Sequence, residues 1–222
     1  MAIYLKKFEN HTQYNNYING SDAILPNVSI CTTEGDVHYN PYVETRLVAK
    51  FNVTDTTNPT QIISQNADSP FSEIEIDGVV QPSVVSAYTF DTLGEHTVKY
   101  TLTDPTSIGN YAFNSCSSLT SIDIPSGVTS ISSAVFGGCN SLTSCTIGSG
   151  VTSIGISAFY KCSSLTSIVS NATTAPIIAS NTFRNVHTGG TLTVPQGSSG
   201  YDVWMGTSNY YLGSYNWTKV EQ

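Results

Sequence analysis

Residues 107–124 read SIGNYAFNSCSSLTSIDI, residues 130–147 read SISSAVFGGCNSLTSCTI, and residues 153–170 read SIGISAFYKCSSLTSIVS. The three stretches align without gaps at a step of 23 residues, so each position recurs as a column. The clearest columns are Phe113, Phe136 and Phe159; Cys116, Cys139 and Cys162; and Leu119, Leu142 and Leu165. A fixed period of this length over several copies predicts a solenoid.

A fourth, weaker copy follows at a step of 24 residues. It keeps the pattern at Ile178, Phe183, Val186, Leu192, Val194 and Pro195. We therefore expect a mainly β leucine-rich-repeat solenoid of about four 23-residue repeats over residues 106–195.

Each copy contains a short predicted strand with the spacing L-x-x-L-x-L, as at Leu119, Ile122 and Ile124. Alternating apolar residues indicate a strand with one buried face. Stacked copies would place these strands in a parallel sheet, about 4.8 Å apart. The rest of the copy, from Ile108 to Cys116, returns the chain across the back. A single copy cannot bury its apolar side chains, so neighbouring copies bury them for each other.

The positions between the buried residues of each strand should face outward and form the open surface of the sheet. They are Ser121, Asp123, Ser144, Thr146, Ser167, Val169 and Thr193. These side chains are small, and none is aromatic or basic. Such a surface lacks the large residues that dominate binding energies, so recognition there would depend on the avidity of many displayed copies.

The repeat pattern resembles the BspA-like, treponemal-type leucine-rich repeats of Bacteroidales, parasites and their phages. The resemblance covers residues 106–195 and departs from the family pattern at Cys145 and Ser170, which replace strand isoleucines. It implies a surface or adhesion protein that binds host proteins, other cells or glycans. It brings no catalytic residues with it.

Charge is distributed unevenly along the chain. The net charge is −8, and of the 24 charged residues only Asp123, Lys161 and Arg184 lie in the repeats. A phosphate-binding surface needs clustered Lys and Arg, so we exclude nucleic acid as a partner. The repeats are instead coated with Ser, Thr, Asn and Gly. No apolar run approaches the ~20 residues of a membrane span, and no signal peptide is visible at the start of the chain.

Residues 46–105 read as a series of short strands. The strongest signals are the runs 47–53 and 96–102, and the alternating run 73–76 that leads into the hairpin turn Asp77-Gly78. About six strands in this length predict a small immunoglobulin-like β-sandwich, similar to the bacterial Ig-like modules that space adhesive domains.

Residues 1–45 are rich in Asn and Tyr. We expect a short helix over residues 8–18 and a strand, turn and strand over residues 28–39. Residues 25–41 resemble a leader seen on proteins of gut Bacteroidales phages and prophages. That resemblance implies an attachment or assembly segment.

Two groups of residues have alternative interpretations. Glu73, Glu75 and Asp77 share one face of a predicted strand, which fits either a calcium site or a solvated outer face; we favour solvation. The cysteine ladder fits either disulfides or a metal site, or else a column of buried reduced thiols. We favour buried thiols, because free Cys is among the most buried residue types and the spacing is unlike a zinc site.

Aromatic residues are concentrated after the repeats, in residues 196–222. Six of them fall within 17 residues: Tyr201, Trp204, Tyr210, Tyr211, Tyr215 and Trp217. They fit a cap that covers the open end of the solenoid, or a platform on which sugar rings stack; we favour the cap and leave room for one or two exposed rings. Trp204, Tyr210, Tyr211 and Tyr215 are the candidate ligand-binding residues.

The sequence contains no motif of catalysis, and we expect no cofactor and no metal. His11, His38, His96 and His187 are scattered without ligand spacing, and we expect each to be a surface residue. We therefore expect a non-catalytic binding module, displayed at a cell surface, extracellularly or on a virion in many copies, that recognises host proteins or glycans. The alternative is a phage virion structural protein (fibre, decoration or tail accessory) that assembles with other virion proteins through residues 1–45.

Overall fold

The computed structural model describes residues 30–31, 38–39, 46–65 and 70–222. The chain divides into two units, residues 1–44 and residues 45–222. In the first unit, strands β1 (Ile30–Cys31) and β2 (His38–Tyr39) pair antiparallel, as the predicted strand, turn and strand require. The helix expected over residues 8–18 lies outside the described residues.

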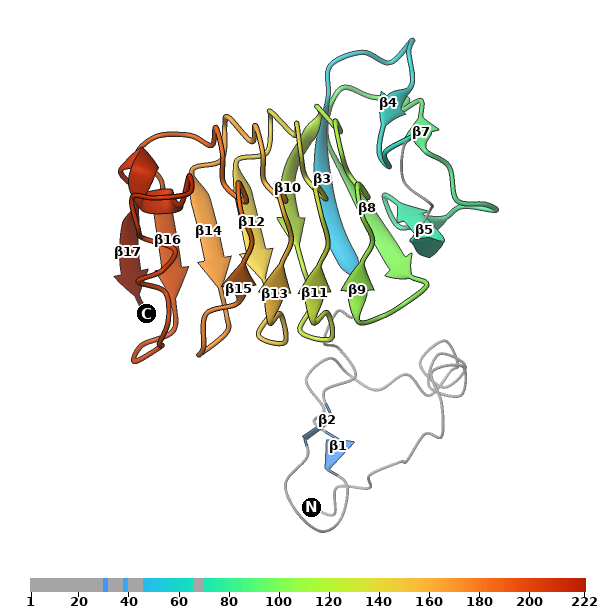
Figure 1. Cartoon of the computed structure of the whole chain (residues 1–222). Helices are drawn as coiled ribbons and strands as arrows, with labels where there is room; N and C mark the ends of the chain where they lie inside the picture. Colours follow the sequence, from blue (N-terminus) through green and yellow to red (C-terminus); the bar gives the residue numbers. More distant parts are fainter. Residues whose placement is uncertain (1–29, 32–37, 40–45, 66–69) are drawn as a thin grey trace. The chain divides into compact units, whose positions relative to one another are not determined.

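The second unit is built on a nine-stranded sheet of order β17-β16-β14-β12-β10-β3-β8-β5-β6 (Figure 1). Its repeat strands pair in parallel, and their register aligns equivalent residues, such as Ser121 with Ser144 and Ser144 with Ser167. The predicted parallel sheet is confirmed. The strands are β10 (Leu119–Asp123), β12 (Ser144–Ile147), β14 (Ser167–Ser170), β16 (Thr191–Val194) and β17 (Thr218–Glu221).

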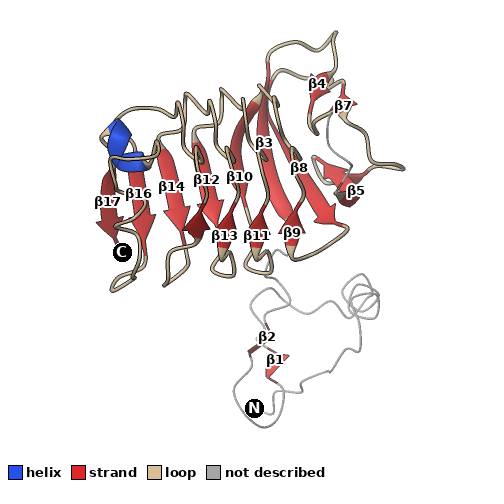
Figure 2. Cartoon of the chain, viewed as in Figure 1, coloured by secondary structure: helices blue, strands red, loops and turns tan. Residues whose placement is uncertain are grey.

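Strand β17 was not predicted, because residues 196–222 lack the repeat pattern. It nevertheless pairs in parallel with β16 and adds one more turn to the solenoid. The short 3₁₀ helix η1 (Leu212–Tyr215) precedes it and is the one helix in the described part of the chain (Figure 2).

A second parallel sheet of four two-residue strands completes the turns. Each strand contains the isoleucine of a V-T-S-I motif or its equivalent, and that isoleucine is buried. The sequence predicted only a returning chain here. The strands are β9 (Ser107–Ile108), β11 (Ser130–Ile131), β13 (Ser153–Ile154) and β15 (Ile177–Ile178).

Equivalent side chains of successive turns stack inside the solenoid. The rings of Phe113, Phe136, Phe159 and Phe183 are fully buried, and neighbouring centroids lie 5.7, 5.1 and 5.6 Å apart. The 24-residue step before Phe183 therefore does not interrupt the column. Burial of each ring stabilises the fold by about 1.5–3 kcal/mol, to which each ring pair adds about 0.5–1.5 kcal/mol.

Threonine hydroxyls form a second kind of column. Thr143 Oγ1 donates to the carbonyl of Thr120 at 2.9 Å, and Thr166 Oγ1 donates to that of Thr143 at 3.3 Å. A parallel set links Thr152 to Thr129 at 3.1 Å. The residues that the sequence indicated as a polar coat thus also bond successive turns together.

The immunoglobulin-like sandwich expected over residues 46–105 is not what the structure shows. Strand β3 (Leu47–Val53) pairs antiparallel with β10 and with β8 (Gly94–Leu102), so this segment continues the sheet of the repeats. Strands β5 (Phe71–Ile76) and β6 (Val79–Val80) end the sheet. The individual strands were largely predicted, but their alternation does not reveal which core they cover. The inward side chains of β3 and β8 join the core of the repeats.

A small antiparallel pair, β4 (Thr60–Gln61) and β7 (Ala87–Tyr88), belongs to the same segment. The chain that follows β4 bonds to the first turn, because the Ser64 N–H donates to the carbonyl of Ala112 at 2.9 Å. The buried Tyr100 hydroxyl donates to the carbonyl of Ile62 at 2.8 Å. We call residues 46–106 the N-terminal cap.

Candidate functional site

The outward face of the main sheet has two chemically different parts. Over the repeats it carries the small residues predicted to face outward, which are all partly or fully exposed. Over the N-terminal cap it carries ion pairs. Arg46 bonds to Glu75 at 2.7 Å, and Lys50 bonds to Glu95 at 2.8 Å. Neither part of this face offers an exposed aromatic side chain on its strands.

Three of the C-terminal aromatic residues form the predicted cap. Trp204 packs against Phe183 with centroids 5.4 Å apart and the rings tilted, and its Nε1–H donates to the carbonyl of Pro176 at 2.9 Å. Tyr201 and Trp217 are buried as well. Trp204 is 1% exposed, so its candidacy as a ligand-binding residue is wrong.

The cap also explains the departure from the repeat pattern at Ser170. This side chain is buried, and its hydroxyl lies 2.6 Å from the hydroxyl of Tyr201. Tyr201 in turn donates to the carbonyl of Ala172 at 2.8 Å. An isoleucine at position 170 would leave the buried tyrosine hydroxyl without this partner.

The other three candidate aromatic residues reach the surface to different degrees. Tyr210 is 46% exposed, whereas Tyr211 and Tyr215 are half-buried and pack against the core. The Tyr215 hydroxyl accepts a hydrogen bond from the Asn185 N–H at 2.8 Å. Tyr210 therefore presents the most surface of the four.

Two basic side chains lie beside tyrosine rings at this end of the solenoid. The Arg184 guanidinium carbon lies 4.9 Å from the ring centroid of Tyr210 and 6.0 Å from that of Tyr160. Lys161 Nζ lies 5.3 Å from the centroid of Tyr160. We call Tyr160, Lys161, Arg184 and Tyr210 the cation–aromatic cluster. Sequence patterns alone cannot reveal such a cluster, because its members belong to three different turns.

A shallow hollow of about 260 Å³ adjoins this cluster and shares Lys161 with it. Amide and hydroxyl groups line the hollow, so it offers hydrogen bonds in addition to the positive charge. Its lining residues are Gly138, Asn140, Lys161, Ser163 and Asn185.

A second, larger groove of about 400 Å³ runs along the short strands. Its floor is made of small residues such as Ser132, Ser153 and Gly155, and Ile177, which is 79% exposed, stands at its side. The groove has no charged lining residue, and its single amide is that of Asn110.

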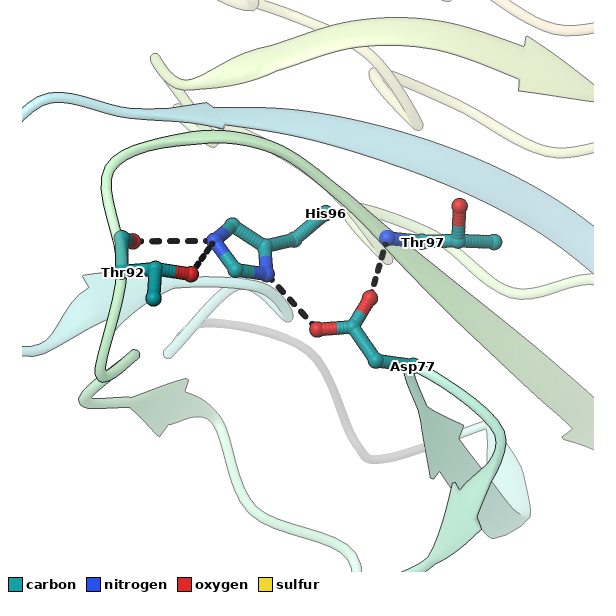
Figure 3. A network of polar contacts seen from close by, with 4 residues as sticks. All are labelled: Asp77, Thr92, His96 and Thr97. Atoms are coloured by element: carbon teal, nitrogen blue, oxygen red, sulfur yellow. Dashed lines mark hydrogen bonds and ion pairs between the residues drawn. The ribbon is translucent and has the colours of Figure 1, made fainter.

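His96 is not the surface residue that the sequence predicted. It is 9% exposed, and its Nδ1 lies 2.6 Å from the Asp77 carboxylate, while its Nε2 lies 2.9 Å from the carbonyl of Thr92 (Figure 3). Burial alone would lower the pKa of His96, but the bonds to Asp77 and Thr92 raise it above its ordinary value of 6.5. The contact joins the turn after β5 to the start of β8. The exposed His187 does match the prediction, and His11 and the side chain of His38 lie outside the described residues.

Two of the three acidic residues predicted to share one face of a strand, Glu75 and Asp77, pair with basic side chains, while Glu73 is exposed. Glu75 bonds to Arg46 and lies 3.7 Å from Lys99 Nζ, and Asp77 bonds to His96. Ile74 and Ile76 are buried on the opposite face, as predicted. Within the described residues, no group of three or more His, Cys, Asp or Glu side chains is arranged to hold a metal ion.

The described thiols are buried and free. Cys139 Sγ donates to the carbonyl of Phe113 at 3.0 Å, and Cys162 Sγ donates to that of Phe136 at 3.1 Å. Burial raises the pKa of Cys139 to about 12 and that of Cys145 further still. Thiols with such a high pKa are poor nucleophiles, so the predicted structural role of the ladder is confirmed.

The family comparison agrees with this architecture. The model of the BspA type leucine rich repeat region, with six copies, matches residues 83–202. The chain belongs to this family, whose repeats form a non-catalytic scaffold. The match extends past residues 106–195 on both sides, into β8 of the main sheet and into the start of the C-terminal turn.

Two further comparisons, with curated proteins and with solved structures, found no match. In the part of the chain that the structure describes, no helix has the length and apolar character needed to cross a membrane.

Proposed function

We propose that the chain is a non-catalytic adhesion module, displayed in many copies at a cell surface, that binds a host protein or glycan through the C-terminal end of its solenoid. BspA-type repeats indicate a protein-interaction or adhesion module, and proteins that carry them are typically associated with surfaces. Family membership supports the general role, whereas the location of the binding surface depends on the side chains of this chain.

The observation that carries the proposal is the exposed Tyr210 beside Arg184. Tyr and Arg are enriched among the residues that dominate binding energies, because both bring large contact areas at a small entropic cost. The small residues on the outward face of β12 and β14 offer no comparable anchor. We therefore assign binding by a single copy to the cation–aromatic cluster.

The experiment compares three variants on arrays of glycans and host proteins, with the chain displayed in many copies. Tyr210→Ala should reduce binding at least tenfold. Tyr111→Ala is the matched control and should bind normally, because Tyr111 is 45% exposed and has the same positive φ, yet it lies on the first turn.

The third variant carries Ser144→Lys and Thr146→Lys on the outward face of β12. If these lysines abolish binding while Tyr210→Ala leaves it intact, the recognition surface is the sheet and the assignment to the C-terminal end is wrong. Thermal unfolding of each variant checks that the fold is retained.

A role as a virion structural protein is the other function that the sequence brought forward. It requires assembly through residues 1–45, of which the structure describes only β1 and β2. A variant that starts at residue 46 and still binds the array ligands would separate adhesion from assembly.

A further inference from the structure

The positive charges of the cation–aromatic cluster lack the counter-charges that other basic residues have. In the described ranges, Arg46, Lys50, Lys99 and Lys219 each lie within 4.0 Å of a carboxylate. Lys161 and Arg184 are the two described basic side chains without such a partner. They lie together although the chain as a whole has a net charge of −8.

The repeat architecture holds these two residues side by side. The Lys161 N–H donates to the carbonyl of Arg184 at 2.9 Å, which fixes them on adjacent turns. Both cationic groups also lie within 6.0 Å of the Tyr160 ring. Like charges gathered around one ring repel one another, and a bound anion relieves the repulsion.

The adjoining hollow supplies hydrogen-bonding groups next to the two cations. The amides of Asn140 and Asn185 and the hydroxyl of Ser163 are donors and acceptors, and Lys161 lies at the boundary between the hollow and the cluster. Its volume of about 260 Å³ is below the range of about 300–1,000 Å³ for drug-sized ligands, so it accommodates a group the size of a single ring.

We propose that this hollow and the cation–aromatic cluster form a binding site for an acidic saccharide, a sugar ring that carries a carboxylate or a sulfate. Lys161 and Arg184 bind the anionic group through charge-assisted hydrogen bonds. Asn140, Asn185 and Ser163 bind ring hydroxyls, and an aromatic ring of the cluster contacts the apolar face of the sugar. The site names the ligand class for the adhesion role proposed above and rests on that role.

A saccharide fits these features better than an acidic peptide or a nucleic acid. A peptide partner needs a larger apolar surface with buried anchors, whereas this hollow is polar and shallow. A nucleic acid needs Lys and Arg clustered along its phosphate backbone, whereas this site offers two cations. Because the two cations are exposed, binding should weaken as salt screens them.

The test measures binding of the whole chain to three oligosaccharides at low salt: oligogalacturonate, which carries carboxylates, dextran sulfate, which carries sulfates, and neutral dextran. We expect one or both acidic oligosaccharides to bind at least tenfold more tightly than dextran. The difference between galacturonate and dextran sulfate identifies the preferred anion.

Two double variants separate a defined site from general electrostatic attraction. Lys161→Gln with Arg184→Gln should weaken binding at least tenfold. Lys50→Gln with Lys219→Gln removes the same charge elsewhere and should change binding less than twofold. Equal losses in the two variants, or equal binding of dextran, would overturn the proposal.

A poly-glutamate peptide of similar charge is the last arm. If it binds as tightly as the saccharides and with the same dependence on Lys161 and Arg184, the site accepts acidic peptides and the assignment to saccharides is wrong. If no acidic saccharide binds while Tyr210→Ala still abolishes adhesion on the arrays, the adhesion role stands and this ligand class fails alone.

Discussion

The N-terminal cap and the repeats contribute strands to one sheet, but different side chains stabilise them. In the repeats, each column stacks the same neutral residue on itself, as in the phenylalanine, cysteine and threonine ladders. In the cap, single contacts join unlike residues, such as Arg46 with Glu75 and His96 with Asp77. The cap strands are antiparallel, whereas the repeat strands are parallel.

The difference follows from what a repeat column can hold. A charged residue repeated in every copy would place like charges on adjacent strands, about 4.8 Å apart, where they repel. Asp123 avoids this, since it pairs in register with Thr146. The cap has no such restriction and is stabilised by ion pairs.

The largest expected effect concerns the thiols of the repeats. At pH 8 a thiol with a pKa of about 12 is ionised in only about 1 in 10⁴ molecules, and the described thiols are also buried. A thiol reagent should therefore leave Cys116, Cys139, Cys145 and Cys162 unmodified in the native protein. After denaturation without reductant, at least four thiols should react; fewer would mean that a disulfide exists.

Removing a ring from the phenylalanine column should have the next largest effect. Phe136→Ala should lower the free energy of unfolding by about 3–5 kcal/mol, as for other core phenylalanines. Phe183→Ala should cost a similar amount, because Trp204 covers its outer side. Urea unfolding measures both. A much smaller loss at Phe183 would show that the C-terminal turn does not act as a full neighbour.

In the cap, the His96–Asp77 contact should make stability depend on pH. The folded pKa of His96 lies above its ordinary value, so this contribution is complete below about pH 6.5 and is lost as pH rises through the folded pKa. Asp77→Asn should cost about 1.5 kcal/mol at pH 6, the lower range for hydrogen bonds to charged groups. The difference between wild type and variant should shrink by pH 9. An equal difference at both pH values would contradict the charged contact.

The smallest expected effect comes from comparing a cysteine inside the repeats with the cysteine of the first turn, next to the N-terminal cap. Cys139→Ala removes a hydrogen bond to the previous turn, whereas Cys116, in the first turn, has no such bond among the described residues. Cys139→Ala should therefore cost about 1 kcal/mol more than Cys116→Ala. Equal losses, measured by urea unfolding, would mean that the thiol–carbonyl bonds contribute nothing beyond packing.

Much of the fold was predictable because residues that recur at a fixed step in the repeats pack against one another. Phe113, Cys116 and Leu119 recur at a fixed step, so their columns and their burial follow from the sequence. The N-terminal cap was harder to predict. The alternation in β3 indicates which face of the strand is buried, but not that this face packs against the core of the repeats. Strand β17 carries no repeat pattern and pairs through its backbone, which sequence patterns do not report.

The candidate site was predicted only in part. The crowding of aromatic residues after position 200 indicated that some would cap the solenoid, but not that Trp204 would be buried and Tyr210 exposed. Lys161 and Arg184 were visible as two of the few charges in the repeats. Their position beside Tyr160 depends on how adjacent turns stack, and their lack of carboxylate partners depends on the pairing of the other basic residues.

The aromatic column has a consequence for the length of the molecule. Tyr100 meets Phe113 at one end, with centroids 5.1 Å apart, and Trp204 meets Phe183 at the other. Tyr100 and Trp204 each contact the nearest phenylalanine of the column. A chain with an additional 23-residue copy between Ile147 and Ser153 would therefore leave the ring neighbours of both residues unchanged. Every added copy would move Tyr210 about 4.8 Å further from the first strand. The chain can thus be elongated in equal increments, and the distance between its two ends can change while the chemistry of each end is preserved.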